Sequence, residues 1–376
     1  ILLHSDFSWK NYNLIKPEFF DKFWNSHLTK ENKILFILGQ GFDPRMCLGF
    51  KSISNNHSGL IDLMVIKYGD EKEANPISKS LQNNLTQLSS LITSKVQQIN
   101  CPLKTTSKNK TTAESRKITE IFSNISDFAE YSDIIIDISA LPITLYFPLC
   151  GKILYLLDHA DKEKHVPNFH IMVAENQLMD SKIKEIEVED RANYLYSFAS
   201  DLGKEADKKP NVWIPLLGEN TDIHLGKIQT LVNPIEICPL FPSPSINPRR
   251  GDDLILEYID LFSKFKVETR NFVYGAEQNP FEAYRQIMET IHNYPEVFVS
   301  KGGCRIVLSA LTSKLLSLSA FLVATEMKTK KELNVGIAHI SAKIYDINPI
   351  IQNSEIINKS ELFSLWISGD CYDQCS

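Results

Sequence analysis

Short, continuous apolar runs separated by longer segments of mixed polarity make up the first half of the chain. A run of this kind, bounded by turn residues, is typical of a β-strand covered on both faces. Strands are expected at 33–38, 59–68, 133–138 and 169–174, with helices at 76–99 and 143–157. An aromatic-rich helical lead-in is expected at 1–31, and an exposed loop rich in Lys, Thr and Ser at 100–115.

The same alternation returns in the second half of the chain. Strands are expected at 271–274, 305–308 and 333–339, with helices at 280–293 and 313–327. Pro280 fits the first turn of its helix, where a backbone N–H has no partner in any case. Strands that alternate with helices favour parallel sheets built from βαβ units. The fold class is therefore predicted as α/β, with two Rossmann-like parallel-sheet halves.

A proline-rich segment, 201–255, separates these halves. Proline lacks a backbone N–H and fixes φ, so the segment disfavours a long helix or a central strand. It is expected to be an ordered, irregular connector with one short strand at 212–214. Its NPRRGDD sequence is interpreted either as crossing between domains or as a surface turn with local ion pairs. The predicted organisation is a lead-in at 1–31, a first Rossmann-like domain at 32–200, a proline-rich connector at 201–255, and a second Rossmann-like domain with a C-terminal tail at 256–376.

Two segments of the chain can be aligned with one another, 134–144 (IIIDISALPIT) and 304–314 (CRIVLSALTSK). Each is an apolar strand followed by Ser-Ala-Leu and the start of an apolar helix. A glycine-bearing turn lies upstream of each, at Gly39 and Gly41 in the first half and at Gly275 in the second. The pattern fits a duplicated Rossmann-like domain. Because any two βαβ units share these features, chance similarity is the alternative.

Composition narrows the class of protein. The chain has 376 residues, of which 43% are hydrophobic and 23% charged, and its net charge is −6. These values are ordinary for a globular protein with a buried core. An extended nucleic-acid duplex is disfavoured as a partner because its recognition usually needs a basic face, whereas a single anionic ligand is compatible. No apolar run approaches the roughly 18 residues of a membrane span, so no membrane partner is expected.

The seven cysteines form no CxxC pair. Cys371 and Cys375 lie close together, but no histidine is near them, so a zinc site is not expected. Scattered cysteines in apolar segments are typical of reduced thiols and favour a cytoplasmic protein, and the first residues are too short and polar for a signal peptide. His170, His224 and His339 are isolated in the sequence and are interpreted as structural. No metal is predicted, and the sequence indicates no particular cofactor.

The sharpest candidate for chemistry is the sequence LGQGFDPR, directly after the first predicted strand. Gly39 and Gly41 allow a tight turn and a close approach of the backbone to a ligand, and the amides of such a turn can bind an anion. Asp43 is placed either to accept a ribose hydroxyl or to cap a helix whose first residue is proline. Arg45 has the fork geometry that pairs with phosphate or carboxylate. A strand-to-helix turn with an Asp cap and no ligand explains the same residues.

Two further acids and a serine follow predicted strands in the first half. Asp70 ends the second strand, where an acid can hold ribose hydroxyls, although acids there are also common in solvated loops. Asp137 and Ser139 lie at the carboxyl end of the third strand, where open α/β sheets bind ligands. Because burying a carboxylate is costly without partners, Asp137 is expected either to pair with Arg45 or to cap the following helix.

The second half offers its own candidate site. Ser309, Thr312 and Ser313 supply hydroxyl groups and helix-start amides after a predicted strand. Lys314 places a positive charge at a helix start, which is mildly unfavourable unless an anion binds there; a solvated lysine is the alternative. Glu277 follows the strand at 271–274 and is expected at the same end of the sheet.

Residues 308–314 (LSALTSK) with the helix after them, and more loosely Asp137 and Ser139, resemble the ligand-binding end of CARF domains. Fused pairs of such domains, as in SAVED modules, sense cyclic oligonucleotides in prokaryotic antiviral systems. The resemblance covers part of the chain. It implies a Rossmann-like ligand sensor and a role in antiviral defence.

Three functions fit the sequence. The first is a binding module or sensor that recognises a nucleotide-like anion at the carboxyl ends of the strands in its two halves. The second is an enzyme, a nucleotide or nucleoside hydrolase or N-glycosidase, in which paired acids act as base and ribose anchor. No complete catalytic motif is present to support it. The third is a structural subunit with a protein partner in a larger complex.

Overall fold

The chain divides into two compact units, each built from two separate stretches of sequence. The structure, a computed structural model, describes residues 7–68, 76–103, 110–161, 165–199, 209–331 and 333–373. Residues 11–186 and 345–376 form one unit, called the β2 unit after its central strand, and residues 1–10 and 187–344 form the other, the β9 unit. The chain therefore passes from one unit to the other at 10–11, 186–187 and 344–345.

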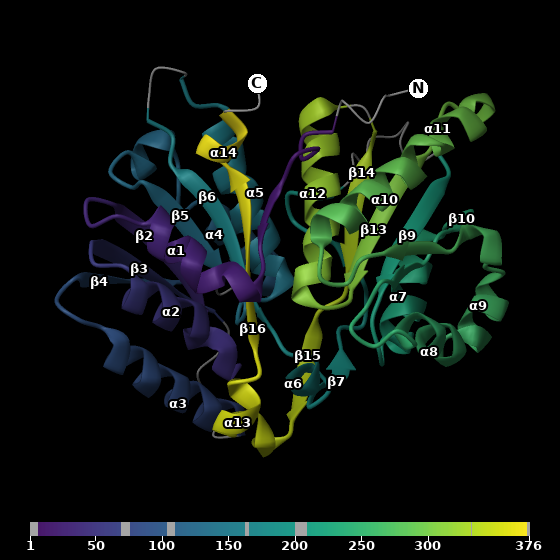
Figure 1. Cartoon of the computed structure of the whole chain (residues 1–376). Helices are drawn as coiled ribbons and strands as arrows, with labels where there is room; N and C mark the ends of the chain where they lie inside the picture. The colour runs from purple at the N-terminus through teal and green to yellow at the C-terminus, as the bar shows by residue number, and fades with distance from the viewer. Residues whose placement is uncertain are drawn as a thin grey trace. The chain divides into compact units, whose positions relative to one another are not determined.

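The β2 unit holds a mostly parallel sheet whose strands come from distant parts of the chain (Figure 1). The strand order is β1 (Asn13–Ile15), β16 (Glu361–Ser368), β6 (Asn168–Glu175), β5 (Asp133–Asp137), β2 (Lys33–Gln40), β3 (Leu60–Lys67) and β4 (Val96–Pro102). Strands β2 to β6 run parallel, β16 pairs antiparallel with β6, and β1 pairs antiparallel with β16. The order reverses between β2 and β5, which makes the carboxyl ends of these strands a topological switch point.

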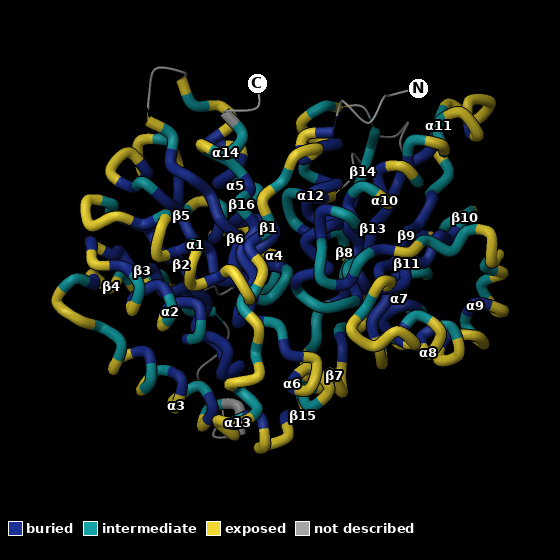
Figure 2. The backbone as a smooth tube through the Cα atoms, viewed as in Figure 1, coloured by how far each residue is buried: buried dark blue, intermediate teal, exposed yellow. Residues whose placement is uncertain are grey.

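Helices cover both faces of this sheet. On one face α1 (Phe20–His27), α2 (Leu48–Asn56) and α3 (Pro76–Leu91) share a core with the even-numbered apolar residues of β2. On the other face lie α4 (Lys110–Thr119) and α5 (Ile143–Asp158), as right-handed crossovers into β5 and β6 require. Figure 2 shows the strands at the centre of the sheet buried. Short helical turns are η2 (Pro17–Phe19), η3 (Pro44–Cys47), η4 (Ile125–Phe128), α6 (Gln177–Asp180), η8 (Pro349–Gln352), α13 (Ser354–Ile357) and α14 (Asp370–Asp373).

The β9 unit holds a second, largely parallel sheet. The strand order is β12 (Val273–Gly275), β11 (Leu240–Pro242), β9 (Asn211–Leu217), β13 (Arg305–Leu311), β14 (Val335–His339) and β8 (Asn193–Tyr194), and β10 (Glu236–Ile237) also pairs with β9. Only β8 is antiparallel to its neighbour among these pairs. One face packs on α7 (Asp222–Val232), α8 (Arg250–Glu257) and α9 (Ile259–Phe265), and the other on α10 (Pro280–His292) and α12 (Lys314–Lys330).

Smaller elements complete the β9 unit and the crossings between units. They are η6 (Thr269–Asn271), α11 (Tyr294–Val297), η7 (Val299–Lys301), and a separate two-stranded sheet of β7 (Ile183–Val188) and β15 (Ala342–Ile347). Residues 7–10 join this unit through Trp9, whose ring meets Tyr284 of α10 edge-on at 5.7 Å. Each strand of the small sheet contains one of the crossing points.

The two large sheets share one strand order. Numbered along the chain within each unit, with β10 and β11 counted as one interrupted strand beside β9, the parallel strands are arranged third, second, first, fourth, fifth, followed by an antiparallel strand next to the fifth. This arrangement is the Rossmann-like, doubly wound order, so the predicted α/β fold class is confirmed. The aligned segments 134–144 and 304–314 contain the fourth strand of each sheet, β5 and β13. In the strand order, the counterpart of Gly41 after the first strand is Gly218, whereas Gly275 ends the third strand.

The proline-rich segment differs most from its prediction. Instead of an irregular connector, it contributes the central strand β9, which includes Pro215, together with α7, β10 and β11. On one side β9 pairs with β13 along its whole length. On the other side its neighbour changes from β10, which pairs up to Trp213, to β11, which pairs at Leu216. The ladder is interrupted beside Pro215, so its missing N–H removes no bond on that side.

Several strands, β4 and β16 among them, were not anticipated by the hydrophobic pattern. β4 occupies the end of the segment expected to be a helix, and β16 lies in the segment expected to be a tail of the second domain. β4 is the edge strand of its sheet; only Val96 in it is buried, and polar residues such as Gln97 and Gln98 are exposed. The region 1–31 contains β1 as well as the helix α1.

Candidate functional site

The switch point of the β2 unit is closed by close packing of its own chain. A Cβ atom added to Gly41 would lie 2.9 Å from the Tyr68 hydroxyl and 3.0 Å from the Ala140 carbonyl oxygen. A Cβ on Gly39 would lie 2.5 Å from Cδ2 of Leu141. The expected close backbone approach is therefore present, but the group that approaches is the turn after β5.

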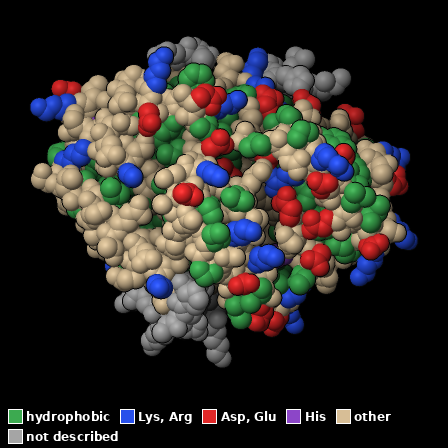
Figure 3. All heavy atoms as spheres, turned by 60° about the horizontal axis from the view of Figure 1, so that its bottom comes forward, with side chains coloured by type: hydrophobic (Ala, Val, Ile, Leu, Met, Phe, Trp, Pro, Cys, Tyr) green, Lys and Arg blue, Asp and Glu red, His purple; other side chains and the backbone are tan. Residues whose placement is uncertain are grey.

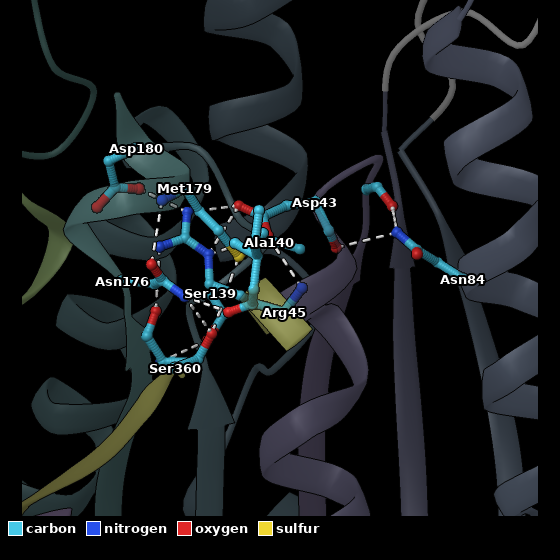
Figure 4. Close-up of polar contacts among 12 residues, drawn as sticks. Asp43, Arg45, Asn84, Ser139, Ala140, Asn176, Met179, Asp180 and Ser360 are labelled. Carbon is cyan, nitrogen blue, oxygen red and sulfur yellow. Dashed lines mark hydrogen bonds and ion pairs between the residues drawn. The ribbon is translucent and has the colours of Figure 1, made fainter. Parts of the chain in front are cut away.

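Asp43 and Arg45, which follow the Gly41 turn after β2, form a compact, buried ion pair (Figure 4). Asp43 is the N-cap of η3 and accepts a hydrogen bond from the Arg45 backbone N at 2.9 Å, so the capping role predicted for it is present. The Arg45 guanidinium donates from Nε and Nη2 to both Asp43 oxygens at 2.7–3.1 Å. It also donates to the Ala174 carbonyl at 3.3 Å and to Asp180 Oδ1 at 2.7 Å.

The two carboxylates keep the buried guanidinium charged. Burial alone would lower the pKa of Arg45, but the negative charges of Asp43 and Asp180 outweigh it and hold the pKa well above its ordinary value. The Arg45 side chain is 6% exposed, whereas that of Asp180 is 43% exposed. One of the two anionic partners of a buried arginine is therefore open to solvent.

Polar side chains from helix α3 and from the segments before α6 and β16 fix this arrangement (Figure 4). Asn84 of α3 donates to the carbonyl oxygens of Gly41 and Asp43, both at 2.9 Å. Asn176 caps α6, the helix that carries Asp180, and donates to Ser360 Oγ at 3.0 Å. The loops after β2 and β6 are thereby held from the side of α3 and from the C-terminal segment.

Asp137 and Ser139 lie inside this network and are buried. Asp137 Oδ1 accepts from the Ser139 backbone N at 2.9 Å, and Ser139 Oγ accepts from the Ala174 backbone N at 2.8 Å. Asp137 does not cap the following helix, because the N-cap of α5 is Pro142. A Cβ on Gly49 of α2 would lie 2.4 Å from Asp137 Oδ2, so the helix packs tightly on the carboxylate. Asp70, the remaining candidate of this half, lies outside the described residues.

The switch point of the β9 unit has the same arrangement, a glycine against a neighbouring strand end and an arginine between two carboxylates, built from different residues. A Cβ on Gly218, after β9, would lie 2.6 Å from the Leu311 carbonyl oxygen at the end of β13. Arg250 forms a bidentate pair with Glu219, at 2.7 and 2.8 Å, and its Nη1 contacts Glu277 Oε1. Burial would raise the pKa of Glu219, but Arg250 lowers it.

Each unit thus places a buried arginine between two carboxylates at the carboxyl ends of its strands. Glu277 lies where the sequence predicted it and accepts a further hydrogen bond from the Ile246 backbone N at 3.2 Å. Arg250 was not among the predicted site residues. Its signal, the NPRRGDD sequence, was interpreted as a crossing between domains or as a surface turn with local ion pairs; in the structure Arg250 is instead buried and pairs with Glu219 and Glu277, which are distant in sequence.

The remaining candidates of the second half divide into core and helix-start residues. Ser309 is not at the strand end, because β13 continues to Leu311; it is fully buried and accepts from Trp213 Nε1 at 3.0 Å. Ser313 caps α12 by accepting from the Leu316 backbone N, and Lys314 is the first residue of that helix. Thr312 lies in the turn between β13 and α12, at the predicted end of the sheet. Ligand binding by these residues stays a prediction.

The distribution of charged side chains and the character of the helices bear on the predicted partners. On the face that Figure 3 draws, Lys and Arg side chains lie among Asp and Glu side chains, so its described part forms no continuous basic surface. No helix among the described residues has the length and apolar character needed to cross a membrane.

The comparisons with known proteins bear on the fold alone. No protein-family model matches the chain, and no curated protein matches it. Similar solved structures include a geranyl diphosphate methyltransferase in complex with GPP and sinefungin, 8% identical over 42% of this chain and 45% of the other, with a TM-score of 0.21. They also include MNMC2 from Aquifex aeolicus, 10% identical over 46% and 53%, with a TM-score of 0.24. Each match spans about half of the solved chain, and scores this low carry no argument about function.

Proposed function

We propose that this protein binds an anionic, nucleotide-like small molecule at the switch point of the β2 unit, where Asp180 occupies the position of the ligand's anionic group. One observation carries the proposal. Arg45 is buried and charged, yet one of its two carboxylate partners, Asp180, is 43% exposed and sits on the short helix α6.

The chemistry of the pair supports an exchange of partners. Open α/β sheets bind ligands outside the carboxyl ends of the strands at the point where the order reverses. A guanidinium fork suits phosphate as well as carboxylate. A buried arginine left with too few partners is costly, so the free protein keeps Asp180 on Nη2 of Arg45. A phosphate that displaced Asp180 would meet the same donor, and the displaced carboxylate would enter water.

The alternative functions find less support in these contacts. The hydrolase hypothesis needs Asp43 and Asp137 as free catalytic acids, but Asp43 holds Arg45 and Asp137 accepts from the Ser139 backbone. The resemblance to CARF and SAVED proteins makes cyclic oligonucleotides one class of ligand to test, with antiviral sensing as the associated role. A purely structural subunit would bind none of these molecules.

The test is a thermal-shift panel of mono-, di- and cyclic oligonucleotides on the full chain. A ligand at a hundred times its Kd stabilises the native state by about 2.7 kcal/mol, or roughly 5–10 °C for a domain of this size. In Asp180→Asn the competing charge is gone while the shape is kept. Because an exposed ion pair contributes up to about 1 kcal/mol, the ligand is expected to bind this variant up to about fivefold more tightly.

Two variants complete the design. Arg45→Lys keeps the charge but loses the fork, and binding is expected to weaken. Asp190→Asn removes an equally charged, exposed residue of the β9 unit that pairs with Lys343 and serves as the matched control. The proposal is overturned if no nucleotide stabilises either the natural protein or Asp180→Asn. It is also overturned if a nucleotide binds with an affinity that neither Asp180→Asn nor Arg45→Lys alters.

A further inference from the structure

Two histidines and an aspartate meet at the amino end of β5, at the edge of the sheet opposite to the switch point. His27 ends α1, Asp133 begins β5, and His170 lies in β6. Asp133 Oδ1 is 2.7 Å from His27 Nε2 and 3.5 Å from His170 Nε2. The three ligand atoms lie within 4.8 Å of one another. Pairing of β5 with β6 brings His170, which is isolated in the sequence, close to Asp133.

His170 has few partners for a buried imidazole. Its side chain is fully buried, and among the described residues Nδ1 has no hydrogen-bond partner, while Nε2 has only the 3.5 Å contact with Asp133. A buried polar group without a partner costs free energy. Burial lowers the pKa of His170 more than Asp133 raises it, which favours the neutral ring. Neutral imidazole is the form that binds a metal ion.

Asp133 is oriented so that one oxygen faces both rings. Its Oδ2 accepts from Ser132 Oγ at 2.7 Å, which leaves Oδ1 directed at His27 and His170. Burial alone would raise the pKa of Asp133, but the contacts to His170 and His27 lower it below its ordinary value. The group is therefore an anionic carboxylate fixed by a second residue, the arrangement that supports metal ligands in proteins.

Aromatic rings hold both imidazoles in place. The Trp366 ring lies 4.8 Å from His27 and 5.0 Å from His170, and Trp24 lies 4.8 Å from His170. Phe23 stacks on His27 at 5.0 Å. The His27 side chain is 15% exposed, which gives solvent access on one side of an otherwise apolar surround.

We infer that His27 Nε2, His170 Nε2 and Asp133 Oδ1 bind one divalent ion of the Zn²⁺ type. Two imidazoles and a carboxylate suit borderline ions such as Zn²⁺ and Co²⁺ better than Mg²⁺ or Ca²⁺. Tetrahedral bonds of about 2.0–2.1 Å place ligand atoms roughly 3.3 Å apart. The His170–Asp133 contact of 3.5 Å already fits, and the His27–Asp133 contact has to open from 2.7 Å. Nε2 of His27 is open to the ion in the tautomer that carries its proton on Nδ1, and water completes the shell on the exposed side.

The experiment titrates Zn²⁺ and Co²⁺ into the full chain, expressed without a polyhistidine tag and stripped with a chelator. One equivalent is expected to bind. Co²⁺ is expected to give visible absorption and to quench the fluorescence of the adjacent Trp24 and Trp366. His27→Gln is expected to weaken Zn²⁺ binding at least about tenfold. Ser132→Ala removes the hydrogen bond to Asp133 Oδ2 and a longer one to the Lys33 carbonyl oxygen, and it is expected to weaken Zn²⁺ binding by about 10- to 100-fold.

His159→Gln is the matched control, because His159 is an exposed histidine at the end of α5 in the same unit. It is expected to leave the affinity unchanged. The inference is overturned if the stripped protein binds no more Zn²⁺ than His27→Gln does. It is equally overturned if the Co²⁺ absorption persists in His27→Gln, a partly exposed position whose variant keeps the core intact. Nucleotide binding at the other edge of the sheet is independent of both outcomes.

Discussion

Gly218 and Gly226 provide a pair of identical substitutions with opposite expected effects. Both lie in the β9 unit, Gly218 directly after β9 and Gly226 inside α7. In Gly218→Ala the new Cβ would lie 2.6 Å from the Leu311 carbonyl oxygen, 0.8 Å closer than the 3.4 Å at which ordinary contact begins (3.4 − 2.6). The obstacle is backbone at the end of a central strand, which cannot swing away. Overpacking of this kind costs about 1–3 kcal/mol.

Gly226→Ala meets nothing within 4 Å and lies in a helix. There alanine is favoured over glycine by about 0.8–1.0 kcal/mol. A change of 1 kcal/mol moves Tm by about 2–4 °C in a domain of 150–250 residues. Gly218→Ala is therefore expected to lower the Tm of the β9 unit by roughly 2–12 °C, and Gly226→Ala to raise it by roughly 2–4 °C.

Differential scanning calorimetry of the two variants beside the natural protein measures both shifts. Trp213 of β9 is fully buried, so its fluorescence contributes a signal from this unit. Equal Tm shifts of the two variants, or a Gly218→Ala variant with unchanged Tm, would refute the reasoning that glycine is needed where the end of β9 passes the end of β13.

Two further predictions concern single side chains. Ser309→Ala is expected to lower the free energy of unfolding by about 1–3 kcal/mol, because the buried Trp213 indole N–H loses its acceptor. Urea denaturation measures this loss. If Ser309→Ala changed nucleotide affinity but not stability, the assignment of Ser309 to the core would be contradicted. Burial, with a smaller contribution from Asp137, raises the pKa of Cys47 to about 12, so about one thiol in ten thousand is ionised at pH 8. Iodoacetamide labelling followed by peptide mass spectrometry should leave native Cys47 unmodified from pH 7 to pH 9 and modify it in urea, and rapid native labelling would contradict its burial.

The fold was predictable wherever strands are buried on both faces. The runs that form β2, β3, β5 and β6 are apolar at nearly every position, and no other element produces that pattern at that length. β4 was not predicted as a strand, because an edge strand carries exposed polar residues and lacks a continuous apolar run. β9 was predicted only as a short strand at 212–214, because Pro215 lies where the ladder has no bond to lose, and that depends on where two other strands end. Such information is not contained in the strand's own sequence.

The candidate site was predictable in position and not in its contacts. Glycines and acids after strands marked the correct end of the sheet, since strand ends are visible in the hydrophobic pattern. Their partners were not visible, because Asp180 is 135 residues from Arg45 and Glu219 is 31 residues from Arg250. Asp133 and His27, 106 residues apart, illustrate the same limit. Local sequence shows which groups reach an edge of the sheet, and only the strand order decides which of them meet.

The position of β16 has a consequence for synthesis on the ribosome. β16 lies between β6 and β1, yet it starts 186 residues after β6 ends (361 − 175). At about 5–20 residues per second, roughly 10–40 s pass between the emergence of these two strands. During that time the whole β9 unit leaves the exit tunnel, while one edge of β6 has no neighbour to pair with. The unit whose strands are made first is completed last, and its open edge is exposed meanwhile to pairing with other nascent chains.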